Sequence, residues 1–195
     1  DRVSQPTLVI TGTEDLVIMD SADLGVMSAE QLGALTSAQV QAIDSSDLNA
    51  LSATDLNEFG TAQIRALSQS QIDGLATDTI GRLSPTLVAA LSTEQISWLD
   101  TADLHAMGAD QLGALSAAQL KAIATSEIDG ITASALGGLS ATQIAALNTE
   151  QVAALSTDQL QALSDSQVAG FSTYQLVTMG SEDLSTLTAS QIQAR

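Results

Sequence analysis

The sequence predicts an all-α protein, a solenoid or superhelix of about 24 eight-residue repeats that are each a short capped helix of roughly two turns. Three observations predict it. Every residue whose number is a multiple of eight, from Leu8 to Ile192, is Leu, Ile or Val. A second apolar residue follows three positions later through Leu187, interrupted only by Thr11. The next residue is Ser, Thr, Asp, Asn or Gly, except at Ala76 and Ala124.

The polar positions of the repeat predict where each helix begins. Ser140 is followed three residues later by Gln143, which is the spacing of a capping box: each side chain satisfies one backbone N–H group at the start of a helix. Leu139 precedes the cap and Ile144 lies four residues after it, as in a hydrophobic staple. Because this arrangement recurs in one register along the chain, we expect a helix start near every residue numbered four more than a multiple of eight.

Each repeat must form a separate helix. In one continuous helix, eight residues at about 100° each would move the apolar stripe by about 80° per repeat, and no single face could be buried. A β-strand is excluded because the apolar spacing alternates between three and five instead of two. We therefore expect helices of about six or seven residues, in which the C-terminal cap of one repeat serves as the N-terminal cap of the next.

The charged residues agree with this assignment. Most of the 23 acidic residues fall at the cap or in the first turn of the predicted helices, whereas all five basic residues and His105 fall in the other half of the repeat. A helix dipole favours negative charge at its N-terminus and positive charge at its C-terminus. The charge pattern therefore supports the predicted helix boundaries and direction.

A single repeat cannot fold alone. Burial of two aliphatic side chains contributes about 3–6 kcal/mol, whereas ordering eight residues costs roughly 12 kcal/mol. The repeats must therefore pack on one another as one elongated domain, with divergent N-terminal repeats at 1–27 and regular repeats at 28–195. The sequence starts at Asp1 already inside the repeat register, so we interpret it as a segment of a longer protein.

Composition argues against several classes of function. The net charge of −18 disfavours nucleic acid and anionic membrane surfaces as partners, and no apolar run is long enough to span a bilayer. There is no Cys, and His105 is the single His, so we predict no catalytic residue, no metal site and no cofactor. Acid pairs such as Asp100 and Asp103 have the spacing of a capping box, and we interpret them as caps. The sequence therefore predicts a protein that is not an enzyme.

A few unusual residues are candidate contacts for a ligand. The position two residues after the first apolar site usually holds Ala or Gly, which indicates close approach of backbones. Glu58, Arg82 and Trp98 also occupy this position, and they are weak candidates for ligand binding. In the N-terminal repeats the same position holds Ile10, Ile18 and Val26. These residues predict either extra core in a divergent terminal repeat or an apolar end that contacts a neighbouring domain or another copy.

The Leu-Ser/Thr-x-x-Gln-Leu/Ile/Val-x-Ala-Leu pattern, as at Leu139–Leu147, resembles tracts in very large secreted or surface proteins of proteobacteria, often labelled as adhesion or haem-utilisation proteins. The resemblance covers essentially the whole chain and implies a stalk or adhesin segment without functional residues. The segment Leu35–Ile43 also resembles the first helix of DNA-reading repeats in plant-pathogen effectors. Those repeats have about 34 residues and a basic inner stripe, both of which this chain lacks.

Two functional hypotheses follow. The first is a non-enzymatic structural segment, a stiff acidic spacer or stalk in a large secreted or cell-surface bacterial protein, with an adhesin as one form. The second is a ligand-binding helical scaffold that uses the inner surface of the superhelix for a peptide, glycan or cation. Partners under either hypothesis include neighbouring domains of the same chain or self-association through the N-terminal apolar repeats.

Overall fold

The computed structural model describes residues 21–194. Within that range the chain forms 21 α-helices and one 3-10 helix, with no strand, which confirms the predicted all-α solenoid. The helices are α1 (Ser21–Gly25), α2 (Ala29–Gly33), α3 (Ser37–Gln41), α4 (Ser45–Ala50), α5 (Ala53–Leu56), α6 (Thr61–Ala66), α7 (Gln69–Asp73), α8 (Thr77–Arg82), α9 (Pro85–Ala90), α10 (Thr93–Ile96), α11 (Thr101–Ala106), α12 (Ala109–Gly113), α13 (Ala117–Ala122), η1 (Thr125–Gly130), α14 (Ala133–Leu136), α15 (Ala141–Ala146), α16 (Thr149–Ala153), α17 (Thr157–Ala162), α18 (Asp165–Gly170), α19 (Thr173–Thr178), α20 (Ser181–Thr186) and α21 (Ala189–Gln193).

The capping boxes form where the sequence predicts them. At α15 the Ser140 hydroxyl accepts a hydrogen bond from the backbone N–H of Gln143, and the Gln143 side-chain oxygen accepts one from the backbone N–H of Ser140, at 2.8 Å. Reciprocal bonds of this kind open most of the described helices, for example at Ser68, Ser116 and Ser156. The predicted helix starts are therefore confirmed.

The described helices have four to six residues: twelve of the 22 have six, as predicted, and the others are shorter. The predicted sharing of one cap residue between successive helices is not seen at the corner between α15 and α16. Leu147 closes α15 with φ −59° and ψ 143°, and Asn148 opens α16 with φ −77° and ψ 168°. Two successive extended residues turn the chain there, so the end of one helix and the cap of the next are neighbouring residues and not one shared residue. Helices with an extended C-cap, such as α15, have six residues, whereas shorter helices, such as α16, end at a C-cap in the right-handed helical region, here Ala154.

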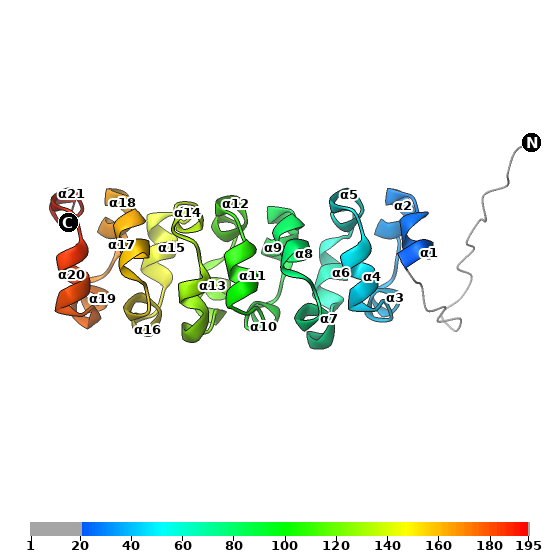
Figure 1. Ribbon diagram of the computed structural model, residues 1–195, viewed down its shortest axis with the longest axis horizontal. Helices are drawn as coiled ribbons and strands as arrows, with labels where there is room; N and C mark the ends of the chain where they lie inside the picture. Colours follow the sequence, from blue (N-terminus) through cyan, green and yellow to red (C-terminus); the bar gives the residue numbers. More distant parts are fainter. Residues whose placement is uncertain (1–20, 195) are drawn as a thin grey trace, which may run out of the picture.

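The solenoid makes one turn for every three repeats. Each helix packs mainly on helices that begin 24 residues before or after it, as α11 packs on α8 and η1. The helices therefore stack in three columns along an elongated body, with α1 near one end and α21 at the other (Figure 1). Column A contains α2, α5, α8, α11, η1, α16 and α19; column B contains α3, α6, α9, α12, α14, α17 and α20; column C contains α1, α4, α7, α10, α13, α15, α18 and α21.

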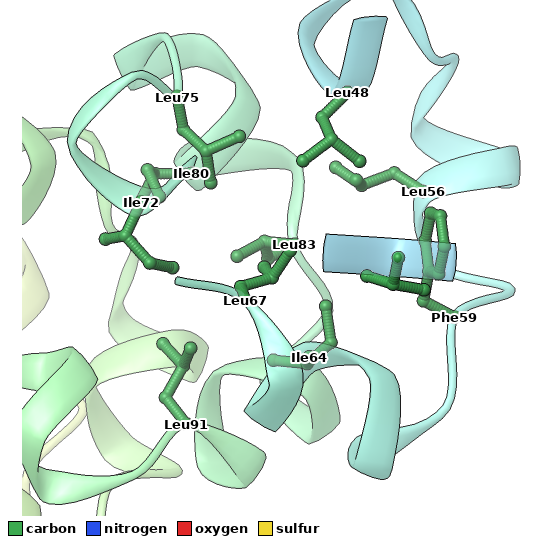
Figure 2. A pocket seen from close by; sticks show the side chains of 11 residues that line it. Leu48, Leu56, Phe59, Ile64, Leu67, Ile72, Leu75, Ile80, Leu83 and Leu91 are labelled. Carbon is green, nitrogen blue, oxygen red and sulfur yellow. The ribbon is translucent and has the colours of Figure 1, made fainter. Parts of the chain in front are cut away.

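The two apolar positions of each repeat fill the interior between the columns. Ile144, Leu160 and Val168 are each 0% exposed, and the buried aliphatic residues form one continuous core. Figure 2 shows side chains from neighbouring turns converging around an internal cavity of about 20 Å³. A cavity of that size could hold about one water molecule, and its aliphatic lining disfavours even that. At this part of the core, between α3 and α9, the side chains fill the interior and the cavity is too small for a peptide or glycan.

The small site brings backbones together, as the sequence predicts. A Cβ atom added at Gly138 would collide with the backbone of Ala109, and one added at Gly170 would collide with the backbone of Ala141. In both cases the glycine faces the first residue of the helix one turn earlier. Ala and Gly at this site thus let successive turns approach closely.

Most of the divergent N-terminal repeats lie outside the described residues, including Ile10, Thr11 and Ile18, and so does Arg195. Of the described part of 1–27, Val26 is 75% exposed and Met27 is 9% exposed. None of the described helices is both long and apolar enough to cross a bilayer.

The stacked core and the caps should differ in their contribution to stability. We expect Ile144→Ala or Leu147→Ala to lower the free energy of unfolding by about 2–5 kcal/mol, because each removes a buried aliphatic side chain. Ser140→Ala should cost about 1 kcal/mol, because it removes one cap and leaves the core intact. Urea unfolding followed by circular dichroism measures both effects. Equal losses for cap and core variants would contradict this account.

Candidate functional site

In most repeats from residue 60 onward, one glutamine links its turn of the solenoid to the turn before it. In α17 the Gln159 side-chain oxygen accepts the backbone N–H of Ser156 at 2.8 Å. Its amide nitrogen donates to the carbonyl oxygen of Ile128 at 2.8 Å and to that of Ile131 at 2.6 Å. Gln159 is 3% exposed, so these bonds form away from solvent. We call this arrangement the glutamine clamp: one amide caps its own helix and fastens it to the preceding turn.

The clamp recurs along the chain with the same offsets of 28 and 31 residues. The buried glutamines that form it are Gln63, Gln71, Gln95, Gln111, Gln119, Gln151, Gln159, Gln167, Gln175 and Gln191. Every buried side-chain nitrogen and oxygen in the described residues has a hydrogen-bond partner. The sequence pattern predicts the cap but misses the link between turns. The available signal is the preference for Gln over Glu, since only the amide has donors left after capping.

A second set of bonds joins turns in the first half of the solenoid. Asn57 donates to the carbonyl oxygen of Arg82 at 2.8 Å and accepts the backbone N–H of Ser84 at 2.6 Å. Asn49 makes the equivalent bonds to Gly74 and Ala76. These bonds run forward along the chain, whereas the glutamine clamps run backward, so the early turns are fastened in both directions.

Departures from glutamine at the clamp position are consecutive in column A, whereas Leu87, Ala135 and Asp183 in column B and Asp23 and Asp47 in column C also depart from it. Four consecutive turns of column A hold Asp55, Thr79, Asp103 and Glu127 at the clamp position. The two repeats without a polar cap, at Ala76 and Ala124, lie in the same column. The repeat that combines Ala124 with Glu127 forms the 3-10 helix η1 instead of an α-helix. One face of the solenoid therefore differs chemically from the other two.

Arg82 replaces the missing clamp in its turn. Thr79 stands at the clamp position of α8 and cannot reach the preceding turn as Gln does. Instead, the Arg82 guanidinium donates to the carbonyl oxygens of Leu51 at 2.6 Å and Asn49 at 3.3 Å. It also donates to the Thr79 hydroxyl at 3.0 Å and pairs with the Asp78 carboxylate at 3.0 Å. The structure thus places a guanidinium at a vacant clamp position.

The candidate ligand contacts do not form one site. Glu58 follows α5 and Arg82 ends α8, so both lie in column A, in successive turns. Glu58 is exposed, whereas the donors of Arg82 are bonded within the protein. Trp98 follows α10 in column C and packs, half-buried, against the apolar core. Trp98 is therefore separated from the other two by its column.

An open groove of about 480 Å³ follows column A across α8, α11 and η1. Its sides combine residues at equivalent positions of successive turns, such as Ala106 with Gly130 and His105 with Asp129. The lining residues are Thr77, Thr101, Ala102, His105, Ala106, Asp129 and Gly130. The small residues Ala106 and Gly130 stand in the groove where Arg82 stands one turn earlier, which explains the open space.

Asp129 lines this groove, and the helices that form it carry two further acids with shifted pKa values. Asp103 in α11 is only 7% exposed. Burial raises the pKa of its carboxyl above the usual value of 3.8; the backbone N–H of Asp100 lowers that pKa, and the nearby charges of Asp100 and Asp73 raise it again. The Thr101 hydroxyl donates to Glu127, and this bond, with a second from Ser126, lowers the pKa of the Glu127 carboxyl. The groove therefore offers hydrogen-bond acceptors and negative charge.

No group of three or more His, Asp or Glu side chains in the described residues could hold a metal ion. His105 is exposed and lies in the groove beside hydroxyl and carboxylate groups.

The ALTTAQ repeat profile matches residues 12–43, 40–85, 121–157, 131–165 and 144–173. These matches together cover more than half of the chain. The chain belongs to the ALTTAQ repeat family. The segment Ala34–Gln39, which reads Ala-Leu-Thr-Ser-Ala-Gln, spans the second apolar site, the cap and the capping-box glutamine of one ALTTAQ repeat. No curated protein matches the chain.

The clamp and the cap can be separated by one isosteric change. Gln159→Glu keeps the oxygen that accepts the Ser156 N–H but replaces both amide donors with an acceptor facing the carbonyls of Ile128 and Ile131. We expect it to lower the free energy of unfolding by about 2–4 kcal/mol at pH 7. Ser156→Ala, the matched cap variant, should cost about 1 kcal/mol. If chemical denaturation shows that Gln159→Glu is the milder change, the clamp contributes less than its geometry indicates.

Asp103 gives a prediction about pH. Because its pKa is raised in the folded state, the folded protein binds the proton more tightly than the unfolded chain does. The resulting stability is fully present below pH 3.8 and is lost as the pH rises through the raised pKa. We therefore expect Asp103→Gln, which also restores the two clamp donors, to raise the melting temperature at pH 7, with a smaller gain near pH 4.

The control for this measurement is Asp110→Asn, which removes one exposed acid from α12. It lowers the net negative charge by the same amount without affecting a buried carboxyl. A gain for Asp103→Gln that is equal to that of Asp110→Asn at both pH values would contradict the role assigned to burial.

Proposed function

We propose that this chain is a non-enzymatic structural segment, a stiff acidic spacer in a large secreted or cell-surface bacterial protein, with a stalk of an adhesin as one form. The observation that carries the proposal is the glutamine clamp. Because each turn is fastened to the one before it by the same bonds, length grows turn by turn while the cross-section stays constant. An elongated solenoid of this kind holds the segments at its two ends a fixed distance apart.

The surface chemistry supports the same role. A net charge of −18 keeps elongated bodies apart in solution and disfavours adhesion to other acidic polymers. Exposed positions after the caps vary among Ala, Ser, Thr, Asp and Glu, and the core and caps persist under that variation. A spacer requires shape and solubility from its surface and places few other demands on it.

Length provides the test. Deleting residues 140–163 removes three whole repeats, which is one turn, and rejoins Leu139 to a serine cap at Ser164. We expect the variant to fold and its largest dimension to shrink by about 8–10 Å, the spacing of packed helices, in small-angle scattering. The parent chain should have a radius of gyration well above the roughly 16 Å of a compact globule of this length.

Deleting residues 140–151 serves as the control, because it joins Leu139 to Val152 and breaks the eight-residue register. This variant should lose helical signal in circular dichroism. An unchanged largest dimension after the 24-residue deletion, or a compact parent chain, would refute the spacer. Labelling of intact bacterial cells by an antibody against this chain tests the surface location, and labelling only after permeabilisation would argue against it.

Ligand binding is a second candidate function, and the segregation of unusual residues in column A favours it. The proposed location changes from the filled inner surface to the outer groove across α8, α11 and η1. Solenoid proteins commonly bind partners along one face of the repeat array.

A further inference from the structure

We propose that the column A groove binds the guanidinium group of an arginine side chain supplied by another peptide or protein. The site lies beside Ala106, at the level of Asp103. This inference deepens the second candidate function and does not depend on the spacer, so either can fail without the other.

The chain itself shows how a guanidinium fits such a site. In α8 the clamp glutamine is replaced by Thr79, and Arg82 supplies the donors that the carbonyl oxygens of Leu51 and Asn49 would otherwise lack. The planar guanidinium reaches both carbonyls at once, which a single ammonium group does less well. Arg82 is thus an internal ligand for a vacant clamp.

One turn later the same position has no such side chain. The equivalents of Thr79 and Arg82 in α11 are Asp103 and Ala106, and the equivalents of the two accepting carbonyls belong to Leu75 and Asp73. Asp103 in its ionised form accepts hydrogen bonds and cannot donate them. Ala106 lines the groove together with Thr77 and His105, so the space that the Arg82 side chain fills one turn earlier is open here, while Asp103 itself does not line the groove and is 7% exposed.

The charges of this turn favour a cation over a neutral donor. Asp73 and Asp100 lie close enough to Asp103 to act on its ionisation, and Asp129 lines the groove. Arg82 meets the Thr79 hydroxyl and the Asp78 carboxylate, whereas an incoming guanidinium would meet the Asp103 carboxylate, because the equivalent of Asp78 in α11 is Ala102. Hydrogen bonds between a guanidinium and a carboxylate are about twice as strong as neutral ones. The geometry therefore selects an arginine side chain as the ligand.

The probe is the peptide acetyl-Gly-Arg-Gly-amide, titrated into the full chain at pH 7.5 in 150 mM NaCl and followed by amide chemical shifts. We expect saturable shifts confined to residues 73–79 and 101–106. The same peptide with citrulline in place of arginine has the same shape without the charge, and its binding should be at least tenfold weaker. A lysine peptide should also bind at least tenfold more weakly, because one ammonium cannot reach both carbonyls.

Two variants locate the site. Ala106→Arg supplies the guanidinium from the chain itself, and it should weaken peptide binding at least tenfold. Ala162→Arg adds the same charge at an exposed position of α17 and should leave binding unchanged within twofold. If Ala106→Arg does not fold, Asp103→Asn provides the same test, because it removes the carboxylate and should also weaken binding at least tenfold.

Several outcomes would overturn the proposal: equal binding of the citrulline or lysine peptide, equal loss in both arginine variants, or shifts spread over the acidic residues of all three columns. The last result would indicate general screening of the net charge. None of these outcomes bears on the change in length that tests the spacer.

Discussion

The fold depends on one constraint: helices of four to six residues leave most of their backbone polar groups unsatisfied at their ends. In a helix of several turns, the unsatisfied N–H and C=O groups at the two ends are a minority of the backbone groups, whereas here nearly every residue is a terminal residue. The glutamine clamp satisfies backbone groups at two helix ends. One amide accepts a hydrogen bond from a backbone N–H at the start of its own helix and donates to carbonyl oxygens at the end of a helix in the preceding turn. Secondary and tertiary structure are therefore stabilised by the same side chain, and neither is expected to persist without the other.

The sequence predicts the local structure well and the arrangement of turns poorly. Residues such as Ser140, Gln143 and Ile144 indicate caps, staples and helix starts, because these depend on spacings within one repeat. Helices of four or five residues, such as α16, are shorter than predicted, because the sequence of the repeat does not mark which helices end early. The partners of Gln159 lie 28 and 31 residues away, and an eight-residue period does not indicate which earlier repeat a residue faces.

The same limit applies to the candidate site. Glu58, Arg82 and Trp98 share one position of the repeat, so the sequence groups them together. The structure assigns the first two to column A and the third to column C, because three repeats complete a turn. The departures at Thr79, Asp103 and Glu127 appear scattered along the chain, yet they follow one another on one face. Column A therefore combines the fewest clamps with the open groove, while columns B and C hold most of the glutamines that fasten the turns.

The position of Trp98 affects how the unfolding of this protein can be observed. It is the single tryptophan, and it packs half-buried against the core near the middle of the stack. In a linear array, each turn contacts only its neighbours, so the ends can fray while the centre stays folded. Intrinsic fluorescence would then follow the central turns alone, whereas circular dichroism averages over every helix. Transitions measured by the two probes need not coincide, and the gap between them would measure how far unfolding spreads along the stack.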